Sequence, residues 1–201
     1  MMNKKLIALS LLLFTYLYSF SQLKTVAERY QDAKHYRNAS ENRPKFISLM
    51  VSLLSDSSQL SLKQITNLNY HIGRMYEEIK EPDSAIVYYE KSLKGEPNYE
   101  VIHRALAFIY LEKTKPFVVQ LNLAKANKDT IANARAYNGY KKLVLKALPH
   151  LEKYQGCSPD DETLSIIVNL YKSIKDTQSL ATLPDRLKVL GTNCVTLLDD
   201  E

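Results

Sequence analysis

Histidine, cysteine and carboxylate side chains are the residues of this sequence that could carry out chemistry. His71 and His103 are placed where successive helices could bring them together, but a zinc site there would need further ligands that the pattern does not supply. Glu77, Glu78 and Glu81 could act as paired carboxylates, although a solvated helix end explains them more simply. The sequence has no H-E-x-x-H, C-x-x-C or G-x-S-x-G motif. We therefore predict no enzymatic activity, no metal and no cofactor.

Cys157 and Cys194 are the two cysteines, 37 residues apart, and each follows the end of a predicted helix. If the helices stack in order, these ends lie side by side and a disulfide is geometrically plausible. A disulfide needs a specific Cα separation, which a sequence cannot establish. Two unpaired thiols in loops therefore remain the alternative.

Residues 1–21 have the pattern of a secretory signal peptide. Lys4 and Lys5 precede an apolar run over residues 6–18, and Ser19 and Ser21 are small residues suited to a cleavage site. The run is shorter than the ~20 residues that a spanning helix needs, so an uncleaved anchor is the less favoured alternative. We expect an exported protein, periplasmic or secreted, that keeps no stable membrane span after cleavage.

The composition fits one helical domain over residues 22–201. The chain has 201 residues, of which 45% are hydrophobic and 24% are charged, and its formal net charge is +5. Without residues 1–21 the charge falls to +3, and we expect this excess to be spread along the chain. No basic run or base-stacking motif accompanies it, so we predict no nucleic-acid partner.

Residues 66–99 carry the clearest helical pattern. Apolar residues recur at three- and four-residue spacings, Glu81-Pro82-Asp83 separates two helices, and Gly95 is expected as a left-handed cap. Seven positions also match the spacing W-x2-L-G-x2-Y…A-x3-F…P, and the segment resembles one unit of the tetratricopeptide repeat family. Asn69 departs from the family pattern, which prefers Trp at that position. The residues that stand at the seven positions are Asn69, Ile72, Gly73, Tyr76, Ala85, Tyr89 and Pro97.

A second unit follows after 34 residues, the repeat length of that family. Leu106, Ala107 and Tyr110 repeat the types found at Ile72, Gly73 and Tyr76. Residues 114–129 then form an irregular insertion, either a lid over the groove or an extra helix. A helix at 130–154, a pair at 161–175 and 177–190, and a fraying acidic tail follow. With a divergent first pair, the resemblance implies an all-α, right-handed solenoid of about four antiparallel helix pairs.

The resemblance also implies where a partner would bind. In that family the first helices of the pairs line a concave face that holds a peptide, so we expect an exported, non-enzymatic scaffold that binds a protein or peptide partner of unknown identity. A structural subunit of a cell-envelope assembly, without a peptide groove, is the alternative. Phe108 and Leu111 could instead be core residues. The partner-binding candidates are Tyr70, Arg74, Glu77, Arg104, Phe108, Leu111, Ser165, Asn169 and Lys172.

Overall fold

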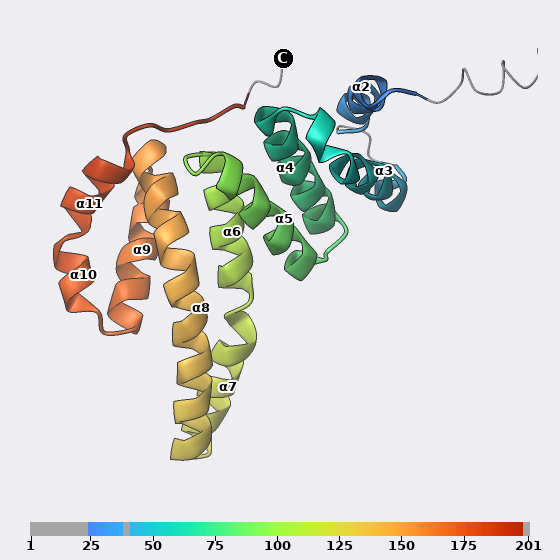
Figure 1. The fold of residues 1–201 in the computed structure, drawn as a ribbon. Coiled ribbons are helices and arrows are strands. Elements are labelled where there is room, and N and C mark those ends of the chain that lie inside the picture. Colours follow the sequence, from blue (N-terminus) through green and yellow to red (C-terminus); the bar gives the residue numbers. More distant parts are fainter. Residues whose placement is uncertain (1–23, 38–40, 199–201) are drawn as a thin grey trace, which may run out of the picture. The chain divides into compact units, whose positions relative to one another are not determined.

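The computed structural model describes residues 24–37 and 41–198, and this part of the chain is all-helical (Figure 1). Its one β-type pairing is an isolated parallel bridge between Tyr99 and Val195. The predicted signal peptide lies outside the described residues. The chain divides into two compact units, Met1–Ser61 and Leu62–Glu201, which are taken separately below.

In its described residues, the first unit consists of a pair of helices, α2 (Val26–Tyr36) and α3 (Arg43–Ser55), followed by the 3-10 turn η1 (Ser57–Gln59). Thr25 and Glu28 form a reciprocal capping box that satisfies backbone donors at the start of α2. Pro44 lies in the first turn of α3, where its missing N–H costs nothing. The rings of Tyr36 and Phe46 stack with their centroids 4.4 Å apart and join the two helices.

The second unit begins with a helix pair, α4 (Leu62–Glu78) and α5 (Pro82–Gly95). Gly73 lies under the ring of Tyr89, and a Cβ added to it would be 2.7 Å from Tyr89 Cδ1. Glycine is therefore needed here for close helix approach. The prediction of a left-handed backbone conformation at Gly95 is wrong, because no described glycine has a positive φ. An added Cβ at Gly95 would be 1.9 Å from Thr66 Oγ1, so this glycine also allows close contact with α4.

Lysine takes the left-handed position in three of the turns of this unit. Lys80, Lys128 and Lys175 have φ values between 55° and 63°, and they follow α4, α7 and α9. The amide after each lysine donates to the carbonyl five residues earlier at 2.9 to 3.0 Å, which is the Schellman arrangement. An acidic residue comes next in each case, and the side chains of Asp129 and Asp176 cap the following helix.

Helix α8 (Thr130–Cys157) is the longest element, about 42 Å at 1.5 Å per residue. Helices α6 (Glu100–Glu112) and α7 (Lys115–Ala126) follow one another along it (Figure 1). The predicted irregular insertion is wrong in its structure, because residues 115–126 form the regular helix α7. Pro116 starts this helix, and Phe117 packs on Gly139 of α8, where an added Cβ would be 2.2 Å from the ring. The extra-helix alternative therefore describes this segment.

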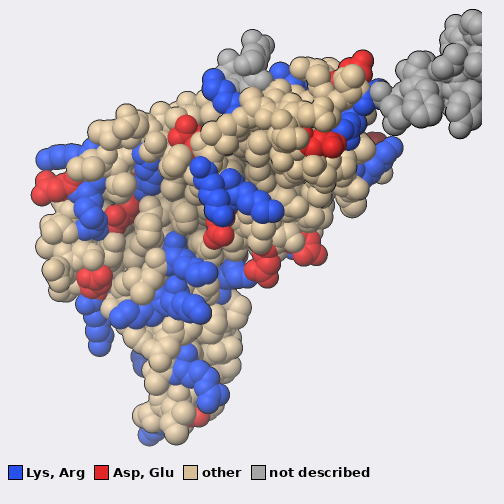
Figure 2. All heavy atoms as spheres, viewed as in Figure 1, with Lys and Arg blue, Asp and Glu red and all other residues tan. Residues whose placement is uncertain are grey.

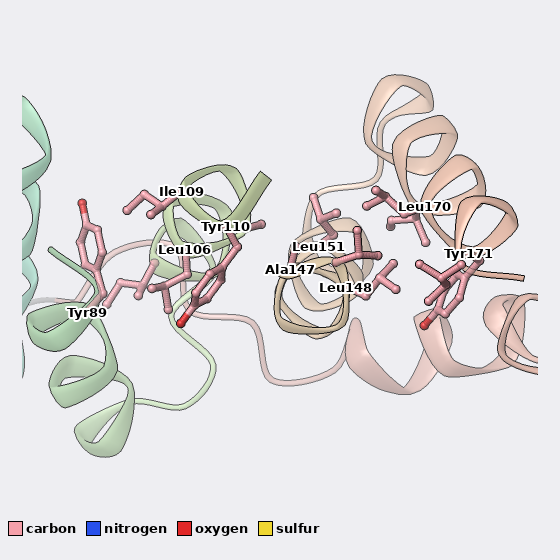
Figure 3. Close-up of a cluster of buried hydrophobic side chains, with 14 of the residues drawn as sticks. Tyr89, Leu106, Ile109, Tyr110, Ala147, Leu148, Leu151, Leu170 and Tyr171 are labelled. Carbon is pink, nitrogen blue, oxygen red and sulfur yellow. The ribbon is translucent and has the colours of Figure 1, made fainter. Parts of the chain in front are cut away.

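The last helices are α9 (Asp161–Ser173), α10 (Thr177–Ala181) and α11 (Leu183–Leu190). The single helix predicted over 177–190 is interrupted at Thr182, because Pro184 occupies the first turn of a new helix. Side chains from five helices form the core of this unit (Figure 3). They include Tyr89 of α5, Leu106 and Tyr110 of α6, Val144, Ala147, Leu148 and Leu151 of α8, Leu170 and Tyr171 of α9, and Leu183 of α11.

The segment after α11 does not fray over residues 194–198; it returns to α4 and is held there (Figure 1). A disulfide joins Cys194 to Cys157, with their Cα atoms 5.6 Å apart. The amide of Val195 donates to Asn98 O at 3.0 Å, and Val195 O accepts from the amide of Glu100 at 2.9 Å. Asn67 Nδ2 donates to the carbonyl of Leu198 at 3.0 Å. The tail is therefore part of the fold.

Candidate functional site

A cavity of about 450 Å³ lies where α4, α5 and α6 meet. Its apolar feature is Phe108, whose side chain is 36% exposed although the other large residues of α6 pack mostly inward. Charged residues of both signs surround it. The lining consists of Glu77, Lys80, Pro82, Phe108, Ile109, Glu112 and Lys113. We refer to this site as the α4–α6 groove.

Two of the charged residues of the groove, Glu77 and Lys113, are held by neighbours. Tyr89 donates its hydroxyl to Glu77 Oε2 at 2.8 Å, and burial, together with this carboxylate, raises the pKa of Tyr89 far above its usual range. Lys113 Nζ pairs with Asp83 Oδ1 at 2.5 Å. Glu77 therefore presents an oriented carboxylate, and Lys113 presents a cation on the other wall.

Arg104 positions the exposed aromatic ring. Its guanidinium lies 5.3 Å from the ring centroid of Phe108 and 5.9 Å from that of Tyr154 on α8. Such cation–π contacts contribute about 0.5–1 kcal/mol at exposed sites and restrict the ring. Phe108 is thus held in place on the surface rather than buried.

The structure brings some of the predicted partner-binding residues together and separates others. Glu77 and Phe108 share the groove, with Arg104 against Phe108. Tyr70 packs beside Tyr99, with ring centroids 5.1 Å apart, and Leu111 is partly buried against the core. Arg74 pairs with Glu78 along α4, at 3.6 Å. The three α9 candidates, Ser165, Asn169 and Lys172, are exposed and do not line the groove.

A second cavity of about 600 Å³ lies between α8, α9 and α11, and sequence reasoning missed it. Pro149, Val189 and Leu190 are among its apolar walls. Glu152, whose side chain is 6% exposed, accepts from Arg186 Nη2 at 2.6 Å and from Arg186 Nε at 3.0 Å. Because the Glu152 carboxylate and the Arg186 guanidinium are already bonded to each other, the cavity suits an aliphatic group better than an ion.

Tyr171 completes that charged cluster. Its hydroxyl donates to Glu152 and lies 3.1 Å from Arg186 Nη2, and burial raises its pKa above the usual range. The hydrogen bond to Glu152 raises the pKa of Arg186 as well. Every charged group here has a partner, which indicates a structural network rather than a proton-transfer site.

Both ring nitrogens of His103 have partners other than His71, namely His150 of α8 and the carbonyl of Pro97, so the His71–His103 pair considered from the sequence does not form. His103 Nε2 is 2.8 Å from the carbonyl of Pro97, which can only accept, so Nε2 carries the proton. His103 Nδ1 must then accept from His150 Nδ1, 3.0 Å away. Burial lowers the pKa of both imidazoles, to about 4 for His150. The pair is neutral.

The other groups considered from the sequence also have structural partners. Glu77 accepts from Tyr89 while Glu78 pairs with Arg74, so these carboxylates do not form an acid–base pair. A carboxylate oxygen of Glu100 lies within 4.8 Å of both cysteine sulfurs, and those sulfurs are bonded to each other. Within the described ranges, no helix is both long and apolar enough to cross a bilayer.

Comparison with known proteins gives little beyond this geometry. No protein-family model matches the chain, and no solved structure matches it significantly. Among curated proteins, the chain is similar to uncharacterized protein ycf37 of Guillardia theta, with 46% identity over 54 residues. The match covers 27% of this chain and 30% of that protein, so the chain spans less than a third of its relative. This similarity shows neither a family nor an activity.

Proposed function

We propose that this chain is an exported, non-enzymatic adaptor of the tetratricopeptide-like kind that binds a peptide segment of a protein partner in the α4–α6 groove. The observation that carries the proposal is the exposed ring of Phe108 in a cavity with Glu77 and Lys113 on its walls. The helix pair α4–α5, closed by Gly73 against Tyr89, supports a repeat-like unit. The right-handed solenoid and the export signal are parts of the same proposal.

The groove favours a particular class of ligand. An aromatic ring that is restrained by arginine and surrounded by charges is typical of the anchor positions in protein interfaces. A peptide with one apolar side chain between charged residues of both signs would cover Phe108 and pair with Glu77 and Lys113. Burying a Phe side chain contributes about 2 kcal/mol, which corresponds to more than tenfold in affinity.

The test is a peptide-display selection against the chain from Gln22 onward, followed by titration of the selected peptide. Phe108→Ala should weaken its binding about tenfold or more. Val87→Ala is the matched control, because Val87 is also exposed (48%) but does not line the groove. Circular dichroism should show the same helicity for both variants.

Two results would count against the proposal. Equal affinity of both variants would place the peptide elsewhere on the chain. A failure to select any peptide, with binding seen only to a whole folded partner, would favour the envelope-subunit alternative instead.

A further inference from the structure

The positive charge of this chain is concentrated in one hairpin, contrary to the even spread expected from the sequence. Residues 115–146, which cover α7 and the first part of α8, contain seven Lys or Arg and one acidic residue, Asp129. The other 169 residues contain 20 basic and 21 acidic residues, so they nearly balance. Figure 2 shows blue side chains over the lower part of the molecule, where this hairpin lies, and little red. We call residues 115–146 the basic hairpin.

Exposed aliphatic side chains gather on the same hairpin. It carries five of the eleven large apolar residues that are exposed in the described part of the chain. Ala124 is the one buried residue of α7. The five exposed residues are Val118 (41%), Val119 (57%), Leu123 (59%), Ile131 (74%) and Leu145 (48%).

One stripe of α7 is apolar and uncovered. Val119, Leu123 and Ala126 recur at four- and three-residue spacings and are all exposed, on the side of α7 opposite Phe117, which packs on α8. A helix with apolar residues on both sides is normally covered on both sides. Among the described helices α7 packs chiefly along α8, and the residues of its outer stripe stay exposed.

We propose that the basic hairpin docks peripherally on an anionic membrane surface. Helix α7 lies in the headgroup region with Val119 and Leu123 turned toward the acyl chains, and Lys125, Lys128 and Arg135 contact lipid phosphates. Interfacial helices combine these two properties, an apolar stripe and flanking cations. Clustered Lys and Arg residues near a surface add attraction to acidic lipid.

A lipid surface fits the hairpin better than an acidic protein does. The cavities described above are lined by other residues, and the hairpin extends along α8 beyond α6 in Figure 1. A folded protein partner needs a matching hollow or flat patch, whereas a fluid bilayer adapts to a projecting aliphatic surface. This docking is independent of the peptide groove, which lies on other residues.

Vesicle flotation tests the proposal with the chain from Gln22 onward, which contains all the described residues and lacks the apolar N-terminal run. Vesicles of phosphatidylcholine with phosphatidylglycerol should bind the chain at least tenfold better than phosphatidylcholine alone. Salt at about 1 M, where the Debye length is about 3 Å, should remove most of that difference.

One single and one double variant of the hairpin, each with a matched control, locate the lipid contact. Leu123→Asp and the double change Lys125→Glu/Arg135→Glu should each weaken binding about tenfold or more. Val87→Asp and Lys45→Glu/Lys63→Glu change residues elsewhere that are also exposed, and these variants should bind like the original chain. Circular dichroism of all four should be unchanged.

Either of two outcomes would overturn the proposal. One is that the unaltered chain does not float with phosphatidylglycerol vesicles. An acidic protein would then be the favoured partner of the basic hairpin. The other is that the hairpin variants and their controls bind equally, which would place the lipid contact elsewhere.

Discussion

The neutral His103–His150 pair should make the stability of the second unit depend on pH. Burial lowers the pKa of His150 to about 4, whereas an unfolded histidine has a pKa of about 6.5. Between these values the unfolded chain binds a proton that the folded chain does not, so the free energy of unfolding falls as the pH falls. The contribution is fully present above pH 6.5. At pH 4.5 about 2 kcal/mol of it should be lost, and at pH 4 about 3 kcal/mol.

Urea unfolding at pH 7 and at pH 4.5, followed by circular dichroism, measures this loss. His150→Asn is the informative variant, because the Asn amide can donate to His103 Nδ1 in place of the imidazole but does not titrate. Its loss between the two pH values should be smaller than that of the original chain by about 2 kcal/mol.

His35→Asn is the control, because His35 is exposed on α2 in the other unit. Capping hydrogen bonds lower the pKa of carboxyl groups such as Asp160 and Asp176, so protonating these groups in acid also destabilises the fold. This loss should be the same in every variant. If His150→Asn and the original chain lose the same free energy, the neutral, buried pair is refuted.

Three further changes probe packing, charge and covalent restraint, each by urea unfolding at pH 7. Gly73→Ala should destabilise by about 1–3 kcal/mol despite its better helix propensity, because the new methyl meets the Tyr89 ring; Tyr89→Leu in the same chain should recover part of the loss. Arg186→Met should cost about 2–3 kcal/mol, less than for a fully buried pair because Arg186 is 32% exposed, and adding Glu152→Leu should restore most of it. Cys194→Ser should cost up to about 4 kcal/mol from the entropy of a 37-residue loop, and reductant should then have no further effect.

The refuting results for these three are also specific. A Gly73→Ala chain as stable as the original would mean that α4 and α5 separate without cost. If adding Glu152→Leu to Arg186→Met restores none of the lost stability, the pair is not coupled. A serine variant as stable as the oxidised original chain would mean that the disulfide adds no stability.

Periodicity and proline positions predict much of this fold because both act locally. The α4–α5 pair and the break at Pro82 follow from residues within a few turns of each other, and the apolar spacing predicts the long helix even though Pro149 lies inside it. The sequence leaves residues 114–129 between a lid and an extra helix, because the aliphatic residues of α7 lie on two sides and one of those sides is exposed in the structure. A pattern that assumes one buried face reads such a segment as irregular.

The lysine turns show a signal that was present in the sequence. Glycine adopts a left-handed backbone conformation with the least strain, so the sequence points to Gly95 as a cap. The left-handed positions lie in other turns, at Lys80, Lys128 and Lys175. Each lysine is followed by an acidic residue, and the Schellman hydrogen bonds offset the backbone strain. The repeated Lys–acid dipeptide could have located all three turns.

For the candidate sites too, local spacing predicts some features, while others depend on how the helices pack. Glu77 and Phe108 could be placed on helices by spacing, but the exposure of Phe108 depends on how α4, α5 and α6 meet. The partners of His103 and Glu152 lie 47 and 34 residues away on other helices. No local pattern encodes such pairs, because they depend on which helices become neighbours.

The returning tail has a consequence for how the chain folds as it is made. Helix pairs such as α4–α5 join residues close in sequence and can form soon after they emerge from the ribosome. The hydrogen bond from Asn67 to Leu198 spans 131 residues and cannot form until Leu198 has emerged. The contact that fastens the returning segment to α4 is therefore available only to chains that have been synthesised through Leu198.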